Sequence, residues 1–180
     1  MVTPPELGLV SWFKSSDLGP GRLAGNAWVS SVGKFTAHPT QGAVRTVTQA
    51  GHGARLPVRM VGGDTASSYT FGPIIPEQYT ICSLSRYNGT TWERILQGTR
   101  TNWLHGHWSS KAGVAYYEDW LNLKTRVSPG DNWVNMCGSS HVVFLDSLDR
   151  DVRIALSGLR GMSIYQVTGA GCLHVPETVL

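Results

Sequence analysis

Residues 79–121 decide the fold that this sequence predicts. They read YTICSLSRY (79–87), NGTTW (88–92), ERILQGT (93–99) and, two residues later, NWLHGHWSSKAGVAYYEDWL (102–121). Apolar and polar residues alternate within these runs, and Gly, Asn and Thr lie between them, which is typical of half-buried β-strands joined by turns. Because the runs are also rich in Trp, Tyr and His, they indicate a β-surface that binds something rather than a catalytic centre.

Further strands are predicted on both sides of this stretch, with turn residues about every 8–12 positions. The predicted strands are 8–13, 55–61, 79–87, 94–98, 103–108, 113–121, 132–137, 142–145, 152–156 and 162–167, and residues 26–32 and 42–48 are predicted to be short strands or extended loops. The Pro-rich residues 72–77 predict a crossover loop, because proline is confined to the edges and connections of sheets. No helical period persists, so the sequence predicts an all-β fold, a two-sheet antiparallel β-sandwich or jelly roll.

Length and composition agree with one such domain. The chain has 180 residues, of which 15% are charged, with 21 Gly and 7 Trp. A chain of this length buries roughly two thirds of the surface of its unfolded form, so its core needs no metal or disulfide. Low charge with many glycines favours turns and sheets over amphipathic helices. No linker or repeat divides the chain, and we expect a single domain over residues 1–180.

The charge pattern argues against two classes of partner. The net charge of +3 comes from 15 basic and 12 acidic residues, and the basic residues are scattered singly along the chain. Nucleic-acid-binding proteins concentrate Lys and Arg on one face, so we expect no nucleic-acid partner. No apolar run approaches the roughly 18 residues of a membrane-spanning helix, so we expect no membrane insertion.

The N-terminus and the cysteines leave the compartment open. Residues 1–13, MVTPPELGLVSWF, lack the basic start and apolar stretch of a signal peptide, which indicates a cytosolic chain or a mature fragment, with an extracellular location preferred. Cys82 and Cys137 lie in predicted strands, where a free cysteine behaves as a small apolar residue. We therefore expect free structural thiols rather than a Cys82–Cys137 disulfide. Cys172 lies in a Gly-rich tail that is open to pairing with another chain.

The order of the motifs resembles that of a known family. GLVSWFKSSDL (8–18), WVSSVGKF (28–35), YTICSLSRY, RILQGT, DNWVNMCGSS (131–140) and HVVFLDSL (141–148) follow one another as in the laminin-G-like branch of the concanavalin A-like lectin and glucanase superfamily. The resemblance covers roughly residues 8–167 and implies a jelly-roll sandwich with glycan as the leading ligand class. The closing strand departs from the family pattern, since GMSIYQVTGAGCLHV (161–175) replaces the usual acidic and aromatic strand.

The carboxylates do not form a catalytic pattern. Glucan-hydrolysing members of that superfamily place E-x-D-x-x-E on one strand, and the sequence contains no such spacing. A retaining glycosidase needs two carboxyl groups about 5 Å apart, whereas Glu118 and Asp119 would face opposite sides of a strand. Asp149 and Asp151 lie in a predicted turn. No G-x-S-x-G motif or phosphate-binding loop occurs either, so we predict that the protein is not an enzyme and has no cofactor.

A pair of histidines raises the alternative of a transition-metal site. His105 and His107 alternate on one predicted strand and would project from the same face, as in strand-borne zinc or iron sites. A third ligand, Glu118 or His141, would be required. A stacking, hydrogen-bonding or structural role for the two histidines is preferred, and no metal is predicted.

Calcium is the other metal that the sequence brings into question. Relatives of this fold hold calcium with Asp, Asn and backbone oxygens. The candidates are Asp64, Asp131 with Asn132, and Asp146, each an isolated carboxylate in a turn. A role in the turn is preferred for all of them.

Aromatic side chains form the remaining candidate site. Pyranose rings present apolar C–H faces that stack on Trp and Tyr, while Asn and His bond the hydroxyl groups. The sequence therefore predicts a ligand-binding surface made of Asn102, Trp103, His105, His107, Trp108, Tyr117 and Trp120. On the strand 113–121, Tyr116 and Trp120 are expected on one face and Tyr117 on the other. About half of the tryptophans are expected in the core, among them Trp12, Trp28 and Trp133.

Two functions fit these features. The first is a noncatalytic binding or adhesion module whose ligand is a carbohydrate. The alternative is a structural or scaffold subunit of a larger multiprotein assembly that uses the same sandwich as a protein–protein interaction module, since Trp, Tyr and Arg dominate interface energies.

Overall fold

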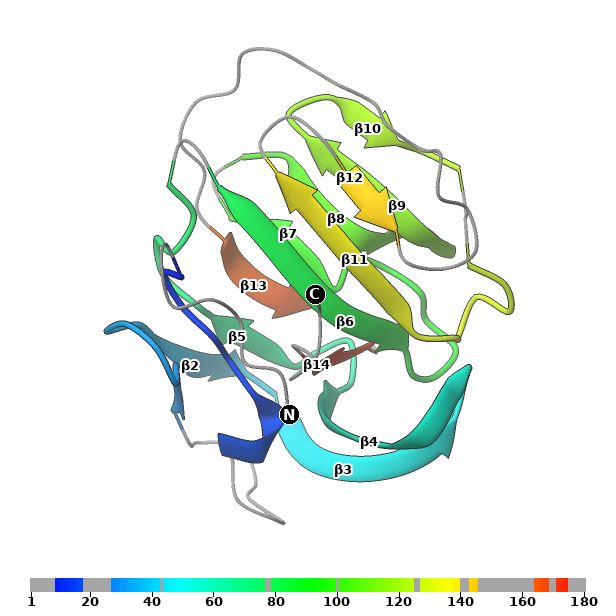
Figure 1. Ribbon diagram of the computed structural model, residues 1–180, viewed down its shortest axis with the longest axis horizontal. Coiled ribbons are helices and arrows are strands. Elements are labelled where there is room, and N and C mark those ends of the chain that lie inside the picture. The colour runs from blue at the N-terminus through cyan, green and yellow to red at the C-terminus, as the bar shows by residue number, and fades with distance from the viewer. Residues whose placement is uncertain are drawn as a thin grey trace.

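The computed structural model describes residues 9–17, 27–42, 44–76, 79–99, 101–124, 127–139, 143–145, 164–168 and 171–174 (Figure 1). The regular structure in these ranges is β-strand, apart from the single-turn 3₁₀ helix η1 (Ser15–Asp17). All strand pairs formed there are antiparallel. The prediction of an all-β protein is confirmed, and the finer assignment to a jelly roll stays a prediction. None of the described residues belongs to a helix long and apolar enough to cross a bilayer.

The first sheet has eight strands. In spatial order they are β1 (Trp28–Val29), β2 (Thr36–Gln41), β5 (Ser68–Thr70), β13 (Ile164–Thr168), β7 (Leu96–Gly98), β8 (Trp103–Trp108), β9 (Lys111–Tyr117) and β10 (Trp120–Asn122). A two-residue turn joins β8 to β9, and its residues Ser109 and Ser110 both have positive φ, 45° and 63°. Positive φ at both central positions is the backbone of a type I′ hairpin turn. β9 is followed in the sheet by β10, which is the last strand at this edge.

The second sheet has six strands. In spatial order they are β12 (Val143–Leu145), β11 (Val134–Ser139), β6 (Thr80–Tyr87), β14 (Gly171–His174), β4 (Ala54–Gly63) and β3 (Val44–Gly51). The β3–β4 hairpin bends strongly and its end approaches the residues just before β11 (Figure 1). There the Trp133 N–H donates to the His52 carbonyl oxygen at 2.9 Å. The hairpin end is thus held against the segment that leads into β11.

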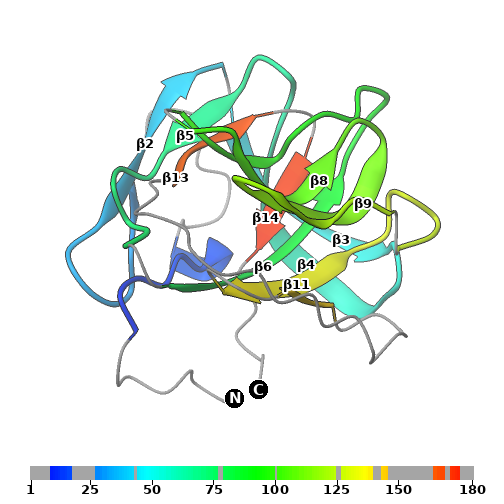
Figure 2. The same ribbon diagram turned by 90° about the horizontal axis from the view of Figure 1, so that it is seen from above.

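Buried side chains from both sheets belong to one apolar core cluster. The labelled strands of the two sheets lie on opposite sides of this interior (Figure 2). In β11, Val134 and Met136 are buried while Asn135 and Cys137 are partly exposed, as alternation on a half-buried strand requires. The expected core residues Trp12 and Trp28 are buried, whereas Trp133 is only partly buried. Fully buried tryptophans also include Trp103.

Several predicted strands agree with the structure and others do not. β8 has the predicted bounds, β6 and β7 differ by one or two residues at one end, and β11 is displaced by two residues at both ends. The strand predicted at 8–13 is wrong for its described part, because residues 9–14 pair in no sheet. The single strand predicted at 113–121 is two strands, β9 and β10, separated by a turn at Glu118, whose φ is 68°. The strand predicted at 152–156 lies outside the described residues.

The cysteine prediction is corrected by the structure. Cys82 on β6 and Cys137 on β11 lie directly opposite each other, with Cα atoms 4.1 Å apart, and form a disulfide. We expected free thiols because each cysteine lies in an apolar strand. The antiparallel register places the two side chains face to face, which allows the bond.

Candidate functional site

The seven residues predicted to bind a ligand separate into two groups. Trp103, His105, His107 and Tyr117 have no exposed surface at all. Asn102 is exposed, and Trp108 and Trp120 are partly exposed. A ring with no accessible surface cannot stack on a ligand from solvent, so the predicted surface is reduced to its three outward members.

Strand pairing explains why three of the four buried side chains form one unit. Trp103 lies opposite Tyr117 across the β8–β9 ladder, and His105 follows two residues after Trp103 on the same face. The three rings are stacked with interplanar angles of 10–18° and centroids 5.3–6.1 Å apart. The Trp103 Nε1–H donates to Tyr79 Oη at 2.9 Å. We refer to Trp103, His105 and Tyr117 as the buried aromatic row.

His105 has a hydrogen-bond partner at each ring nitrogen. Nε2 lies 3.3 Å from the Met136 carbonyl oxygen of the opposite sheet, and since a carbonyl only accepts, Nε2 must be protonated. Nδ1 then accepts a hydrogen bond from the Tyr117 hydroxyl group. Burial lowers the pKa of His105 to about 4, against a weaker opposing effect of the Met136 carbonyl. The ring is neutral at pH 7 and links the two sheets.

His107 is as fully buried as His105 but has fewer hydrogen bonds. Its Nδ1 lies 3.3 Å from Ser85 Oγ on β6, and its ring meets Tyr87 edge-on with centroids 4.6 Å apart. Its Nε2 has no hydrogen-bond partner in the described part of the chain. Burial, and next the nearby His105, lower the pKa of His107 to about 3. Like His105, this histidine is a neutral interior residue.

The histidines do not assemble the considered metal site in the described structure. Both nitrogens of His105 are engaged, and the third ligand considered, Glu118, is exposed at the β9–β10 turn. His141, the other possible third ligand, lies outside the described residues. No group of three or more His, Cys, Asp or Glu side chains that could hold a metal ion occurs among the residues described.

The calcium candidates have other partners. Asp64 accepts hydrogen bonds from the Ser67 hydroxyl group at 2.7 Å and the Ala66 N–H at 3.0 Å, and the Ser67 bond in particular lowers its pKa. Asp131 Oδ2 lies 3.0 Å from His52 Nδ1. Asp146 lies outside the described residues. Asp64 therefore organises its own turn, and Asp131 ties a loop to the β3–β4 hairpin.

The outward side chains of β8, β9 and β10 form an exposed aromatic patch, which we define as Trp108, Lys111, Tyr116 and Trp120. The Trp108 and Trp120 ring centroids are 5.1 Å apart with planes at 48°, and Tyr116 meets Trp120 edge-on, also at 5.1 Å. Lys111 Nζ lies 4.7 Å from the Trp108 ring centroid, within cation–π distance. All four side chains are partly exposed. The patch thus offers apolar ring faces beside a hydrogen-bond donor with positive charge.

Two members of the patch were missing from the predicted site. Alternation on the strand 113–121 placed Tyr116 on the same face as Trp120, and the rings are in contact, yet the prediction chose Tyr117 instead. Lys111 gave no signal in sequence, because its approach to Trp108 depends on the tight hairpin turn. Asn102 lies just before β8, at the opposite end from Trp108, and accepts a hydrogen bond from Arg94 Nη2 at 2.8 Å. Asn102 is therefore outside the patch.

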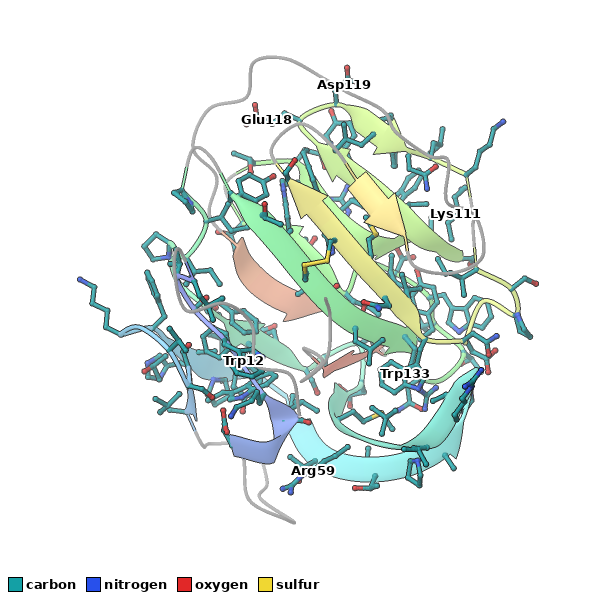
Figure 3. The ribbon with its side chains drawn as sticks, in the orientation of Figure 1. Trp12, Arg59, Lys111, Glu118, Asp119 and Trp133 are labelled. Atoms are coloured by element: carbon teal, nitrogen blue, oxygen red, sulfur yellow. A yellow bond between two sulfur atoms is a disulfide. The ribbon has the colours of Figure 1, made fainter. Side chains whose placement is uncertain are left out.

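Acidic side chains lie next to the patch but are not part of it. Glu118 and Asp119 are exposed at the turn between β9 and β10 and project away from the body of the protein, and Lys111 lies at the other end of β9 (Figure 3). Asp119 Oδ1 accepts a hydrogen bond from the Trp120 N–H at 2.7 Å, which fixes the start of β10. These carboxylates shape the turn that presents Trp120.

The fold and the site define the general class of this protein: it is an all-β protein of antiparallel sheets with an exposed aromatic patch at one sheet edge. Comparison of the chain with protein-family models, with curated proteins and with solved structures finds no match.

Proposed function

We propose that this chain is a noncatalytic binding module that recognises carbohydrate through the aromatic patch. The observation on which the proposal rests is the contact of three partly exposed rings, Trp108, Tyr116 and Trp120, on three neighbouring strands, with Lys111 beside them. An exposed cluster of large apolar side chains on a soluble surface marks an interaction site more often than it marks unused surface. The patch replaces the larger surface that included the buried histidines.

The chemistry of the patch suits a sugar. The apolar C–H face of a pyranose ring packs on an indole ring, and the tilt of 48° between Trp108 and Trp120 lets two ring faces contact a ligand that is not flat. Lys111 supplies N–H donors for hydroxyl or acidic groups on the sugar. Interactions with aromatic faces are large in contact area and cost little conformational entropy, because a Trp side chain has only two χ angles.

We further propose that the two sheets are a jelly-roll β-sandwich related to the laminin-G-like branch of the concanavalin A-like superfamily. The order of sequence motifs supports this assignment, together with the two antiparallel sheets and their common core. A noncatalytic role is supported by the lack of an E-x-D-x-x-E spacing in the sequence. The Cys82–Cys137 disulfide supports an oxidising, extracellular setting for the module. We propose no nucleic-acid or membrane partner.

A glycan array probed with the purified protein tests the carbohydrate proposal. Trp108→Ala should abolish or strongly reduce binding to any glycan that the unaltered protein retains. Val29→Ala is the control, because Val29 is an exposed apolar residue on β1, at the opposite edge of the same sheet from β10. Thermal unfolding of each variant verifies that it is folded. Binding that survives Trp108→Ala and Trp120→Ala, or that Val29→Ala removes, contradicts the placement of the site.

A protein–protein interface is the second candidate function, and the edge position of the patch favours it. β10 is the terminal strand of the eight-stranded sheet, and Leu123 just beyond it is 44% exposed. Edge strands with exposed apolar side chains pair readily with another chain. Two results together would favour this scaffold role over the carbohydrate role. The protein would bind none of the arrayed glycans, and its mass in solution would exceed that of one chain, whereas the Trp120→Ala variant would have the mass of one chain.

A further inference from the structure

Arg86 is a buried cation on the second sheet. It lies on β6 between Ser85 and Tyr87, which face the core, so alternation directs its side chain to the outer face of the sheet. Nevertheless only 2% of the residue is exposed. The ring of Trp133 covers it, with the guanidinium carbon 5.4 Å from the ring centroid. Arg86 Nη2 also bonds Gln49, which lies on the bent β3–β4 hairpin.

The buried charge has no acidic partner. Arg86 Nη1 donates to the Tyr87 carbonyl oxygen at 2.7 Å, and Nη2 donates to Gln49 Oε1 at 2.6 Å. Both acceptors are neutral, and no ion pair to Arg86 forms among the described residues, where the ion pairs are Lys14–Asp17 and His52–Asp131. Burying a charge is costly unless it is paired with an opposite charge.

The unused donor of Arg86 is in the position that a carboxylate needs. Nε is buried and has no hydrogen-bond partner in the described structure. Nε and Nη2 form one edge of the guanidinium, whose parallel N–H groups match the two oxygens of a carboxylate. Gln49 Oε1 occupies only the Nη2 side of this edge. The neutral Gln49 amide oxygen therefore occupies part of the position in which a carboxylate could accept hydrogen bonds from both Nε and Nη2.

Gln49 closes the site as a removable cap. Gln49 as a whole is exposed, although its Oε1 accepts a hydrogen bond from the buried Arg86. Its Nε2 lies 3.4 Å from His52 Nε2 at the hairpin turn. Rotation of an exposed glutamine side chain requires no change in the sheet. Displacement of the Gln49 amide would free Nη2 beside the unpartnered Nε.

We propose that Arg86 is the centre of a carboxylate-binding site capped by Gln49. A carboxylate displaces the Gln49 amide, accepts two hydrogen bonds from Nε and Nη2, and neutralises the buried charge. The carboxylate belongs to a small organic acid or to an acidic sugar, and both present the same planar oxyanion. The site lies on the second sheet and does not include the aromatic patch of the first, so it stands or fails independently of the carbohydrate proposal.

Thermal unfolding with acetate, glucuronate, glucose or chloride at matched ionic strength tests this site. Acetate, glucuronate or both should raise the midpoint of the unaltered protein by about 2 °C or more over chloride, since a ligand that binds only the folded state stabilises it. A response to acetate alone indicates a site limited to small acids, and a response to glucuronate but not glucose indicates a sugar acid. Failure of both carboxylates to exceed chloride overturns the proposal.

Gln49→Glu supplies the carboxylate from within the chain. The variant should unfold about 3 °C or more above the unaltered protein, because a charge-assisted pair replaces a neutral hydrogen bond, and it should no longer respond to acetate. The matched control is Gln41→Glu, which makes the same charge change at an exposed position on β2 of the other sheet and should leave both midpoint and response unchanged. A Gln49→Glu protein that is not stabilised, or that still responds to acetate, overturns the proposal.

Two further variants separate specific binding from general salt effects. Gln49→Ala removes the competing amide and should enlarge the acetate response. Arg86→Met removes the donor edge and should eliminate it. If Arg86→Met does not fold, the two Gln49 variants test the proposal without it. An acetate response that is equal in Gln49→Glu, Gln49→Ala and the unaltered protein would reflect a general salt effect on the protein surface. That result contradicts the site.

Discussion

The buried aromatic row and the exposed aromatic patch come from the same pair of strands and use the same kinds of side chain. Tyr117 belongs to the row and has no exposed surface, while its neighbour Tyr116 belongs to the patch and is partly exposed. The row lies between the sheets and is tied by hydrogen bonds to Tyr79 and Met136. In the described part of the chain, the ring and cation contacts of the patch join its own members, and all four side chains are partly exposed. Residue type alone therefore does not identify a binding surface on these strands.

The comparison teaches that strand phase and local turns divide the aromatic residues between packing and recognition. Successive side chains on a strand point to opposite faces, so two adjacent tyrosines cannot share a role. His105 and His107 alternate on β8 and both lie inside, although the β8–β9 ladder shifts register between Gly106 and His107. The patch exists because the turn at Glu118 restarts the chain as β10 with Trp120 facing Tyr116.

The largest expected effect separates the row from the patch directly. Trp103→Ala removes a fully buried indole from the stack and should lower the free energy of unfolding by about 3–5 kcal/mol, the usual cost of a large cavity. Urea-induced unfolding measures this loss. Trp103→Phe, which retains a ring but loses the hydrogen bond to Tyr79, should lose less. A loss below about 1 kcal/mol for Trp103→Ala would mean that the row does not pack as described.

The disulfide tests the same division of faces in the second sheet. Cys82 and Cys137 are partly exposed on the outer face, opposite to the buried Met136. The double variant Cys82→Ala/Cys137→Ala should lose about 2–4 kcal/mol, because the bond closes a loop across 55 residues in the unfolded chain. Urea unfolding with and without reductant measures it. Reductant should destabilise the unaltered protein and leave the double variant unchanged, and an equal effect on both would contradict the bond.

The two buried histidines, His105 in the row and His107 beside it, make the folded protein sensitive to acid. Because burial lowers the folded-state pKa of His105 to about 4 and of His107 to about 3, the unfolded chain takes up protons below about pH 6.5 while the folded chain does not. Their contribution to stability is complete above pH 6.5 and is lost as the pH falls toward 4. At pH 5 the loss is about 2 kcal/mol for each histidine.

Unfolding free energies measured from pH 7 to pH 4 test this dependence. His105→Gln should fold less stably at pH 7, since Gln cannot reproduce the ring stacking, but it should show a slope between pH 6.5 and pH 5 that is reduced by the share of one histidine. An unchanged slope would mean that His105 titrates normally and is accessible to water. That outcome would mean that His105 is a surface residue and not a member of the buried aromatic row.

Much of the central region could be predicted from alternation alone. The bounds of β8 follow from the run of residues 103–108, and the alternation on 113–121 placed Tyr116 with Trp120 and apart from Tyr117. The prediction failed at the next step, because it treated Tyr117 and the histidines as surface residues for their chemistry. Which face of a strand is covered depends on the second sheet, and a single strand does not specify its partner.

Features that depend on which strands pair could not be predicted from the alternation of apolar and polar residues. β2 (Thr36–Gln41) contains His38 and Pro39, and such a run does not alternate clearly enough to predict a strand. β14 arises from a Gly-containing tail that pairs with both β6 and β4, far away in the sequence. The Cys82–Cys137 bond depends on the register of β6 and β11, which alternation leaves open by any even number of residues.

The smallest expected effect lies in the patch and completes the comparison. Trp108→Ala should change the free energy of unfolding by less than about 1 kcal/mol, since Trp108 is partly exposed and loses mainly its contacts with Trp120 and Lys111. Urea unfolding of Trp108→Ala beside Trp103→Ala measures two substitutions of the same kind on the same strand. If both proteins lost several kcal/mol, Trp108 would be part of the packed structure. Its ring would then be needed to hold β8, β9 and β10 together, and the patch would not be a surface free to bind.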